Sequence, residues 1–315
     1  MLDHSDFFRH NPKMQPDTLS AILSMVEARA VYAGGFSAGG RWAIRFPAPS
    51  MVKIFAIARG QCLVTVDGID QSFQLNEGDT FLLSADEPFV LASDAALEPA
   101  EAHDIFKGQR SRIIPIGGEE DFLFLGSSLD LSSASCQLLL DSLPPTIHLR
   151  AEEAGADQLR WLIAELLWEV KADTPGVDVA CSGLAQLIFL HVLRGYLAQR
   201  SDVEAGWLRA ACDPNLAPAL RLMHGEPARS WRLPELAKAA AMSRTSFAAR
   251  FKAASGMAPL TYLTEWRMRL AERMLHDGLQ PVSSIARSIG YASEAAFSTA
   301  FKRVMRRSPR RNASM

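Results

Sequence analysis

Two copies of one short pattern near the end of the chain combine a serine, two phenylalanines, a lysine and a proline. The copies consist of Ser243, Phe247, Phe251, Lys252 and Pro259, and of Ser293, Phe297, Phe301, Lys302 and Pro309. In each copy the rings are one helical turn apart, so both fall on one buried face of a helix. The lysine then lies toward the opposite face, where an ammonium group can bind an anion such as a nucleic-acid phosphate.

A shorter apolar helix precedes each copy, at residues 233–242 and 282–289. Each serine is a good N-cap for the helix that follows it, because its hydroxyl can accept from a free backbone amide. A short helix, a tight turn and a capped second helix are typical of a helix-turn-helix unit. We therefore predict units at about 231–254 and 282–304, which in tandem would contact consecutive major grooves of double-stranded DNA.

The distribution of charge supports this prediction. The net charge of the whole chain is -2, but the residues from Arg229 to the end contain 16 basic and 5 acidic side chains. The remaining residues contain 17 basic and 30 acidic ones. A charged surface alone is often only a solvated face, whereas a basic domain that also carries the doubled motif would attract a polyanion.

Composition excludes several other classes. No run of about eighteen apolar residues suggests a membrane span, and the N-terminus lacks the order of a signal peptide, so we expect a cytoplasmic protein without a membrane partner. The cysteines are too far apart for a disulfide framework or a zinc site, and we expect buried, reduced thiols. They are Cys62, Cys136, Cys181 and Cys212.

The first half of the chain is organised differently. One short amphipathic helix is expected around residues 18–28, and from Gly34 to Ile116 short apolar runs alternate with turn residues. Asp67-Gly68 is a tight hairpin signal between two of these runs. Closely spaced short strands predict a small antiparallel barrel or jelly roll. The expected strands include residues 52–58, 62–66, 71–75 and 80–83.

After Asp121 the pattern becomes helical. Residues 156–171 and 177–199 carry apolar side chains at helical spacing, and His191 falls within the second stripe as a core or interface residue. Two such helices can pack on the barrel or on a second subunit, so we expect a homodimer. A polar stretch at residues 201–206 is the expected linker.

The C-terminal hundred residues resemble the AraC/XylS family of bacterial transcription regulators. The matching sequence motifs include Trp231-x-Leu233, Leu236-Ala237, Met242-Ser243, Gly256-x-x-Pro259, Trp266-Arg-Met268, Ile285-Ala286, Gly290-Tyr291-x-Ser293 and Ala300-Phe301-Lys302-Arg303. The segments around Trp207 and Leu222 further resemble members whose N-terminal half is a cupin-like sensor. The resemblance implies that the second helix of each unit enters the major groove, and that a helix over Tyr262–Leu275 joins the units.

The expected fold class is therefore α+β multidomain. A cupin-like β-barrel effector domain occupies residues 1–120, a helical dimerisation or linker segment 121–206, and an all-α tandem helix-turn-helix domain 207–315. The joining helix should bury Leu263, Trp266, Leu270 and Met274 and expose Arg267 and Arg273. The predicted core of the DNA-binding domain consists of Leu236, Phe247, Phe251, Trp266, Ile285, Phe297 and Phe301.

The exposed faces of the two second helices predict the DNA contacts. Ala249 and Thr299 stand where many relatives have arginine or glutamine, so few long side chains can read base edges bidentately. We expect phosphate contacts from Arg244, Arg250, Lys252, Lys302 and Arg303. Modest direct readout is expected from Thr245, Ser246, Glu294, Ser298 and Thr299. Each cation taken alone could instead be a solvated surface charge.

The end of the second unit departs from the family pattern. Arg306 replaces the glycine that Gly256 supplies in the first unit. A left-handed C-cap favours glycine, so we expect the last turn to end differently. Asn312 occupies a position where an aromatic residue is common in the family.

The barrel segment has few metal ligands. Between Gly34 and Ile116 the sequence contains one histidine, His103, in a polar stretch, and Lys53 and Phe89 stand where sensor relatives often have histidine. We therefore expect no metal and no other cofactor. A small organic effector bound inside the barrel is a better hypothesis than a metal ion, with Arg45, Lys53 and Gln61 as candidate polar residues that line its site.

The predicted function is a sequence-specific, effector-responsive transcription regulator that acts on RNA polymerase and catalyses no reaction. The resemblance favours an activator over a repressor. One alternative is a cupin-type enzyme fused to a DNA-binding module, which turnover with added iron or zinc would reveal. Another is an architectural DNA binder, which would bind random and promoter DNA equally well.

Overall fold

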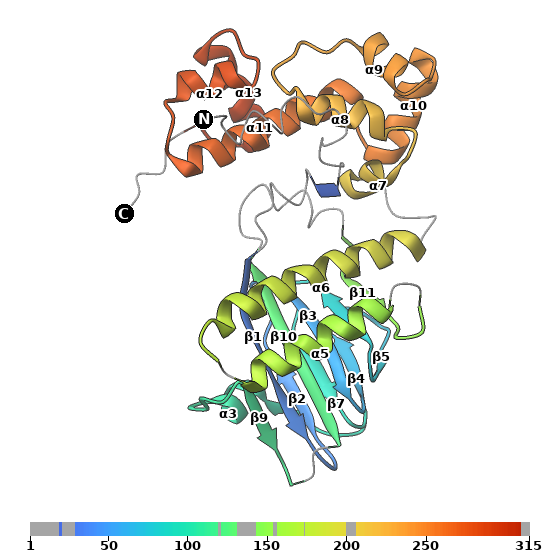
Figure 1. Cartoon of the computed structure of the whole chain (residues 1–315), viewed down its shortest axis with the longest axis vertical. Coiled ribbons are helices and arrows are strands. Elements are labelled where there is room, and N and C mark those ends of the chain that lie inside the picture. The colour runs from blue at the N-terminus through green and yellow to red at the C-terminus, as the bar shows by residue number, and fades with distance from the viewer. Residues whose placement is uncertain are drawn as a thin grey trace, which may run out of the picture. The chain divides into compact units, whose positions relative to one another are not determined.

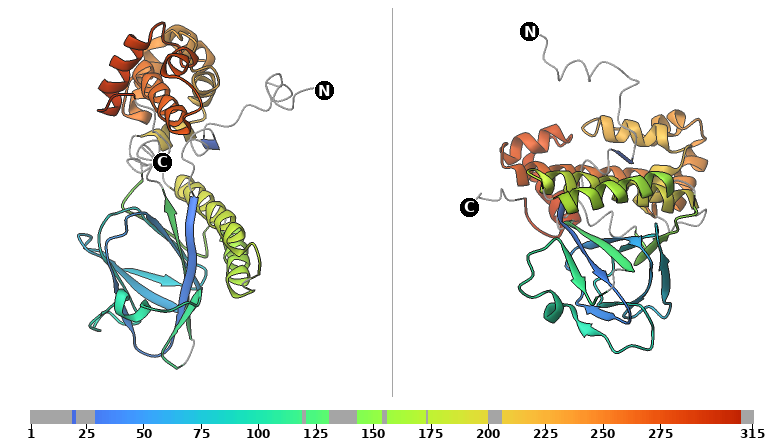
Figure 2. Two further views of the ribbon diagram at one scale, coloured as in Figure 1. Left: turned by 90° about the vertical axis from the view of Figure 1, so that its left-hand side faces the viewer. Right: turned by 60° about the horizontal axis from the view of Figure 1, so that its bottom comes forward.

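The computed structural model describes residues 19–20, 29–118, 121–130, 143–153, 156–172, 174–199 and 206–309. Within them, two compact units are formed, which we call the barrel unit (Arg29–Gln199) and the helical unit (Gly206–Pro309) (Figures 1 and 2). The helix expected around residues 18–28 lies outside the described residues except for Leu19 and Ser20. Asn312, Cys136 and most of the expected linker also lie outside them.

The barrel unit contains two β-sheets. The first has the order β11-β6-β3-β10-β1-β9, antiparallel except for the β1–β9 pair. Its strands are β1 (Arg29–Ala38), β3 (Val52–Arg59), β6 (Thr80–Leu83), β9 (Ile113–Ile116), β10 (Phe122–Asp130) and β11 (Thr146–Leu149). The second has the order β5-β4-β7-β2-β8, with β2 and β8 parallel. Its strands are β2 (Ala43–Phe46), β4 (Gln61–Val66), β5 (Phe73–Asn76), β7 (Phe89–Ala92) and β8 (Ala100–Glu101).

The expected strands are largely confirmed. Asp67-Gly68 forms a turn in which Gly68 has a positive φ of 76°. The hairpin is longer than a two-residue one, however, because β4 and β5 pair only from Gln61–Asn76 to Val64–Phe73. The short helix α3 (Ala102–Phe106) carries His103 outside the strands, as the polar sequence predicted.

The expectation of helical structure after Asp121 is wrong for two segments. Residues 122–130 form β10, which pairs with both β1 and β3 inside the first sheet, and residues 146–149 form the edge strand β11. Each segment is a strand because its backbone groups bond to strands far away in sequence, a condition that local periodicity does not report. The sheet therefore extends well past residue 120.

Two helices cover the outer face of the first sheet, α5 (Ala156–Ala172) and α6 (Val177–Gln199) (Figure 2). Both were expected from their apolar stripes. Because β3 lies between these helices and the second sheet, it is buried on both faces and its sequence is almost continuously apolar. Phe55 and Ile57 join the core between the sheets, while Val52 and Ile54 are buried on the other face.

Helix α6 meets the length and composition of a membrane span over Val177–Ala198, although the sequence was not expected to hold one. In the barrel unit one side of it packs against β1 and α5, with Ile188, Val192 and Leu193 buried. Large apolar side chains nevertheless remain exposed on the two helices. They are Trp161 and Trp168 on α5, and Val179 and Leu187 on α6.

The helical unit consists of seven described helices. They are α7 (Trp207–Cys212), α8 (Ala217–Gly225), α9 (Leu233–Ala239), α10 (Arg244–Ser255), α11 (Pro259–Asp277), α12 (Val282–Ser288) and α13 (Glu294–Met305). The pairs α9–α10 and α12–α13 are the two predicted helix-turn-helix units, and α11 joins them (Figure 1). All seven predicted core residues of this domain are buried.

The caps of α10 and α13 follow the doubled sequence pattern. The Ser243 hydroxyl oxygen accepts from the Ser246 amide at 3.1 Å, and that of Ser293 accepts from the Ala296 amide at 3.2 Å. Gly256 ends α10 in the left-handed conformation. The expectation that α13 ends differently is wrong, because Arg306 adopts the same conformation at φ 58°.

A left-handed arginine costs about 1–2 kcal/mol, and the next residue offsets part of this cost. Arg307 donates to the carboxylate of Glu272 on α11 at 2.6 Å, and its guanidinium lies 5.9 Å from the centre of the Phe301 ring. Glu272 is buried, so the ion pair fixes the chain immediately after α13. Long-range pairing therefore stabilises a turn that the local sequence disfavours.

Candidate nucleic-acid interface

The helices α10 and α13 each present a polar face opposite their phenylalanine pair. On α10 the exposed residues include Arg244, Thr245, Ser246, Arg250 and Lys252. On α13 they include Glu294, Thr299, Lys302 and Arg303, while Ser298 is half-buried. The structure therefore places each predicted set together on one helix, in the sequence positions that the motif required.

Arg250 is already bound within the protein. Its Nε and one terminal nitrogen donate to the two carboxylate oxygens of Asp213, at 2.7 and 3.1 Å. Asp213 lies in the turn between α7 and α8, where burial by itself raises its pKa, but the hydrogen bonds from Arg250 and from the Asn215 amide lower it overall. This pair ties α10 to the start of the helical unit, a role that the sequence pattern did not reveal.

Two hydroxyl groups on the polar faces are oriented differently. The Ser246 hydroxyl accepts from the Ser243 hydroxyl at 2.9 Å, which leaves its own hydrogen free to donate. The Thr299 hydroxyl donates to the Ala295 carbonyl at 3.0 Å, which leaves its lone pairs free to accept. Thr299 also lines a shallow hollow of about 460 Å³ together with Ala295, Ala296 and Arg303. Small apolar side chains of this kind suit a thymine methyl group.

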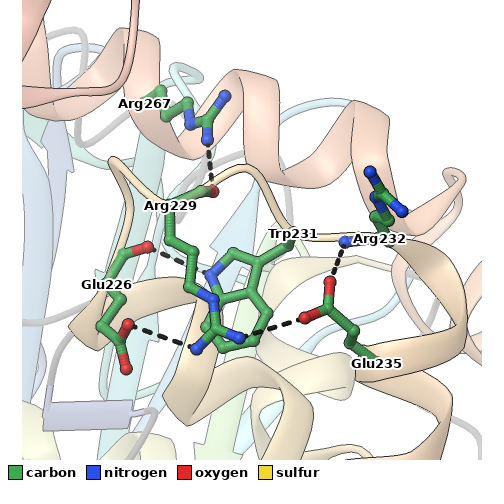
Figure 3. A network of polar contacts seen from close by, with 6 residues as sticks. All are labelled: Glu226, Arg229, Trp231, Arg232, Glu235 and Arg267. Carbon is green, nitrogen blue, oxygen red and sulfur yellow. Dashed lines mark hydrogen bonds and ion pairs between the residues drawn. The ribbon is translucent and has the colours of Figure 1, made fainter.

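The loop between α8 and α9 is fixed by a network of polar contacts (Figure 3). Arg229 pairs with Glu226 at 3.5 Å and with Glu235 at 3.0 Å, and its guanidinium carbon lies 3.8 Å from the centre of the Trp231 ring. The Trp231 indole donates to the Glu226 carbonyl at 3.1 Å, and Glu235 accepts from the Arg232 amide at 2.9 Å. We call residues 226–232 the clamp loop.

The clamp loop contacts the joining helix. Arg267 on α11 donates from Nε to the Pro227 carbonyl at 2.6 Å and from a terminal nitrogen to the Arg229 carbonyl at 2.8 Å. The expectation that Arg267 is displayed to solvent is therefore wrong. Helical periodicity placed it on the outer side of α11, but the clamp loop covers that side, and burial lowers the pKa of Arg267.

The clamp loop also reaches the turn of the second helix-turn-helix unit. Gly290 lies in that turn at φ 88°, and a Cβ atom placed on it would come within 2.3 Å of the Ala228 carbonyl oxygen. The short loop that precedes the first helix-turn-helix unit therefore contacts both α11 and the second unit. Since these contacts are made by backbone atoms and a fixed guanidinium, they restrict the relative orientation of the two polar faces.

An aromatic stack also packs against α11. The rings of His224 and Trp266 lie 3.7 Å apart between centres, and those of Trp207 and Tyr262 lie 4.3 Å apart. A hydrogen bond of 2.9 Å joins His224 Nε2 and the Tyr262 hydroxyl. Burial lowers the pKa of His224 to about 3, so this imidazole is neutral at physiological pH. The stack is a structural core that holds α7, α8 and α11 together.

The barrel unit holds a large cavity of about 1210 Å³. Of the three candidate lining residues, only Lys53 lines it, where its ammonium donates to the Ser128 hydroxyl at 2.5 Å. Arg45 instead pairs with Asp67, and Gln61 is exposed at the start of β4. The sequence therefore identified one of the polar residues of the cavity and misplaced two.

His148 lies on strand β11, in a segment that was expected to be helical and was therefore not predicted as part of the barrel. Its Nε2 lies 3.0 Å from a carboxylate oxygen of Asp79, which also accepts from the amides of Asn76 and Ala151. Burial raises the pKa of Asp79, but these hydrogen bonds lower it overall. Among the described residues, no three histidine, cysteine, aspartate or glutamate side chains gather as a metal ion requires.

Comparison with known proteins places both halves of the chain. Residues 17–198 match the cupin family and residues 236–313 match a helix-turn-helix domain family. The chain is 39% identical over 293 residues to an AraC-like transcription regulator from Streptomyces antibioticus, covering 93% of this chain and 97% of the relative. It is 30% identical over 281 residues to the regulator AlkR from Acinetobacter baylyi, covering 86% and 90% of the two chains.

Among solved structures, the DNA-binding domain of AdpA in complex with a target DNA is 30% identical to this chain. The similarity covers 31% of this chain and 86% of that domain, with a TM-score of 0.29. The sequence identity of 39% over nearly the full length of the Streptomyces antibioticus relative shows which family this chain belongs to. This chain belongs to the family of AraC-like DNA-binding transcription regulators, with a cupin domain ahead of its helix-turn-helix domain.

Proposed function

We propose that this regulator acts in the cytoplasm as a homodimer that inserts α10 and α13 into successive major grooves and responds to a small molecule bound in the barrel. The observation that carries the proposal is the pair of polar helix faces on one helical unit, with the clamp loop restricting their orientation. It catalyses no reaction, and family resemblance favours activation through contact with RNA polymerase.

The charged residues of the two faces supply the phosphate contacts. Arg244, Lys252, Lys302 and Arg303 are exposed on α10 and α13 and are positioned to bind the backbone beside the groove. Arg250 has five N–H donors, of which Asp213 takes two, so the others can reach a phosphate from a fixed orientation. In this proposal Asp213 orients Arg250 toward the phosphate and does not withdraw it from the DNA contacts.

Base readout depends on short side chains. Ser246 can donate to an acceptor such as guanine O6 or N7, whereas Thr299 can accept from an adenine or cytosine amino group. Thr245, Glu294 and Ser298 complete the set. Because these residues reach only a short distance, sequence preference also depends on the shape and deformability of the DNA.

The exposed apolar residues of α5 and α6 support a homodimer. Trp161 and Trp168 are each 60% exposed and lie seven residues apart, so both lie on one side of α5. Val179 and Leu187 add to the exposed apolar surface on α6. Tryptophan at this exposure is typical of interface cores. Sedimentation analysis should give a dimer for the natural chain and a monomer for a Trp161→Glu, Trp168→Glu double variant.

The decisive experiment is a DNA titration at fixed salt with the intergenic DNA upstream of the gene and with random DNA of the same length. Specific binding should fall at least tenfold in a Thr299→Ala, Lys302→Ala double variant, because it loses one hydrogen bond to a base and one charge-assisted hydrogen bond to a phosphate, about 2–4 kcal/mol together. Arg221→Ala, an exposed arginine on α8 of the same unit, is the matched control. Equal affinity for both DNAs would favour the architectural alternative and contradict the proposal.

A further inference from the structure

The cavity of the barrel unit has a distinctive shape beside Lys53. Lys53 and Phe55 on β3 lie directly opposite Ser128 and Gly126 on β10, so these four residues share one face of the sheet. Gly34 on β1 is the next partner of Gly126. Two adjacent strands therefore contribute no side chain at this level, and the Phe124 ring lies over Gly126, where a Cβ atom would come within 2.8 Å of it. Lys53, Gly34, Gly126 and Phe124 all line the cavity.

One side of the cavity is aromatic. Phe46 and Phe89 stack with ring centres 4.9 Å apart, and Phe55 lies 5.1 Å from Phe89. Phe106 and Phe124 also line the cavity. Such a surface favours an apolar or aromatic body over a sugar or another fully polar molecule, because those would lose hydrogen bonds to water without replacement.

The charged residues of the lining are mostly cationic. They are Lys53, Arg59, Arg110, Arg112, Lys171 and Asp178, and Asp178 is paired with Arg112 at 2.8 Å. This excess of positive charge contrasts with the surplus of acidic residues before Arg229. A concave site lined by one sign of charge concentrates ligands of the opposite sign.

Lys53 is the cation that most requires a counter-ion. It is half-buried, burial lowers its pKa, and its hydrogen-bond partner among the described residues is the neutral Ser128 hydroxyl. A desolvated ammonium next to a hydroxyl and an aromatic wall is stabilised by an anion that binds both polar groups. The lysine is therefore better explained by a ligand than by packing.

We propose that this cavity binds a small organic anion, a carboxylate with an aromatic or other apolar body, through Lys53 and Ser128 at one end and the phenylalanine rings at the other. The inference rests on the proposed role of the barrel as the effector site. It adds the chemical class of the effector, which the sequence did not provide.

A matched pair of fluorescent probes tests the charge requirement on the full chain. The anionic probe is 1-anilinonaphthalene-8-sulfonate, and the neutral probe is N-phenyl-1-naphthylamine, which has the same rings without the sulfonate. Lys53→Met should weaken the anionic probe about ten- to hundredfold, the size of a lost charge-assisted hydrogen bond. It should change the affinity of the neutral probe less than about twofold.

Several variants and competitors make the result specific to this cavity. Lys171→Met removes an exposed lysine of the same lining and should weaken the anionic probe less than about threefold. Lys53→Arg should retain most of the binding. Only the fluorescence that 4-phenylbutyrate displaces is counted as binding in the cavity. The neutral amide 4-phenylbutyramide should displace far less of it.

Ser128→Ala is the second variant in case Lys53→Met fails to fold. It keeps the charge of Lys53 and should lower the affinity for the anionic probe about threefold.

Binding of the anionic probe that does not depend on Lys53 and Ser128, or displacement by the acid and the amide alike, would overturn the inference. The same preparations are titrated with the upstream DNA. If the natural chain shows no specific DNA binding, the proposed function fails whatever the probes show. If specific DNA binding is intact while the affinity for the anionic probe is unchanged in Lys53→Met, only the inference of an anion site is overturned.

Discussion

The two units of this chain place positive charge in opposite ways. In the helical unit the cations lie on exposed faces of α10 and α13, while in the barrel unit Lys53 lies inside a cavity of a chain segment that is acidic as a whole. An exposed row of cations suits a long polyanion and is screened by salt. An enclosed cation suits one small anion and is screened less. The geometry, rather than the residue type, therefore sets the class of partner.

The largest effect tests whether the two units are independent. Phe251→Asp buries a carboxylate in the core of the first helix-turn-helix unit and should destabilise the helical unit by more than about 4 kcal/mol. DNA binding should be abolished, while binding of the anionic probe to the barrel should persist. A probe affinity that falls together with DNA binding would show that ligand binding by the barrel unit depends on the folded helical unit. The two units would then not be independent.

A smaller effect tests the clamp loop. Gly290→Ala places a Cβ atom against the Ala228 carbonyl and should cost about 2–3 kcal/mol of unfolding free energy in urea. Gly278→Ala is the matched control, because Gly278 has a similar positive φ of 65° and an added Cβ would come no closer than 3.9 Å, to the His276 carbonyl oxygen, so it should cost only about 1 kcal/mol.

The clamp loop also predicts a pattern in DNA binding. Gly290→Ala should weaken binding to DNA with both half-sites more than binding to a single half-site, because it disturbs the orientation of the two helices. If both affinities fall equally, or if Gly278→Ala behaves in the same way, the clamp loop does not set that orientation.

Salt dependence separates the two kinds of cation. Lys252→Ala and Lys302→Ala should each reduce the slope of log affinity against log salt by about 0.9, the value for one lost phosphate contact. Lys53→Met should leave this slope unchanged, since its partner is not DNA. DNA titrations between low and moderate salt measure the slopes, and an unchanged slope for Lys302→Ala would remove that residue from the interface.

The smallest effect concerns Asp213 and Arg250. The pKa of Asp213 is lower in the folded chain than in the unfolded one, so the pair stabilises the chain fully above the ordinary aspartate pKa of about 4. This stabilisation is lost as the pH falls through the lower folded value. Asp213→Asn should therefore be less stable than the natural chain at pH 6–8 by roughly 1 kcal/mol, and the difference should vanish below the folded pKa. Urea unfolding at several pH values measures it, and a difference that grows toward acid would contradict the assignment.

Local pattern predicted much of the helical unit. The serine caps, the spacing of Phe247 and Phe251 and their repeat at Phe297 and Phe301 identified both helix-turn-helix units. These features act within one or two helical turns, so a single sequence contains them. The same reasoning failed at Arg306, where an ion pair from Arg307 to Glu272 stabilises a turn that local propensity disfavours.

The barrel unit was predicted less completely. Strands β3, β4 and β6 were recognised from their apolar runs, whereas β10 and β11 were expected to be helical. Their pairing partners lie as far as about a hundred residues away in the chain, as for Arg29 and Asp130. A strand whose stability depends on such partners has no local signal that separates it from a short apolar helix.

The sequence by itself determined the tandem helix-turn-helix architecture and the scarcity of metal ligands before residue 116, and it supplied the prediction of which residues bind phosphate. Only the tertiary structure decided that Asp213 holds Arg250, that the clamp loop covers Arg267, and that Lys53 lines a cavity together with phenylalanine rings. The physical reason is the range of the interactions. Caps and helix faces depend on neighbours in the chain, while ion pairs, cavities and strand registers depend on residues that folding brings together.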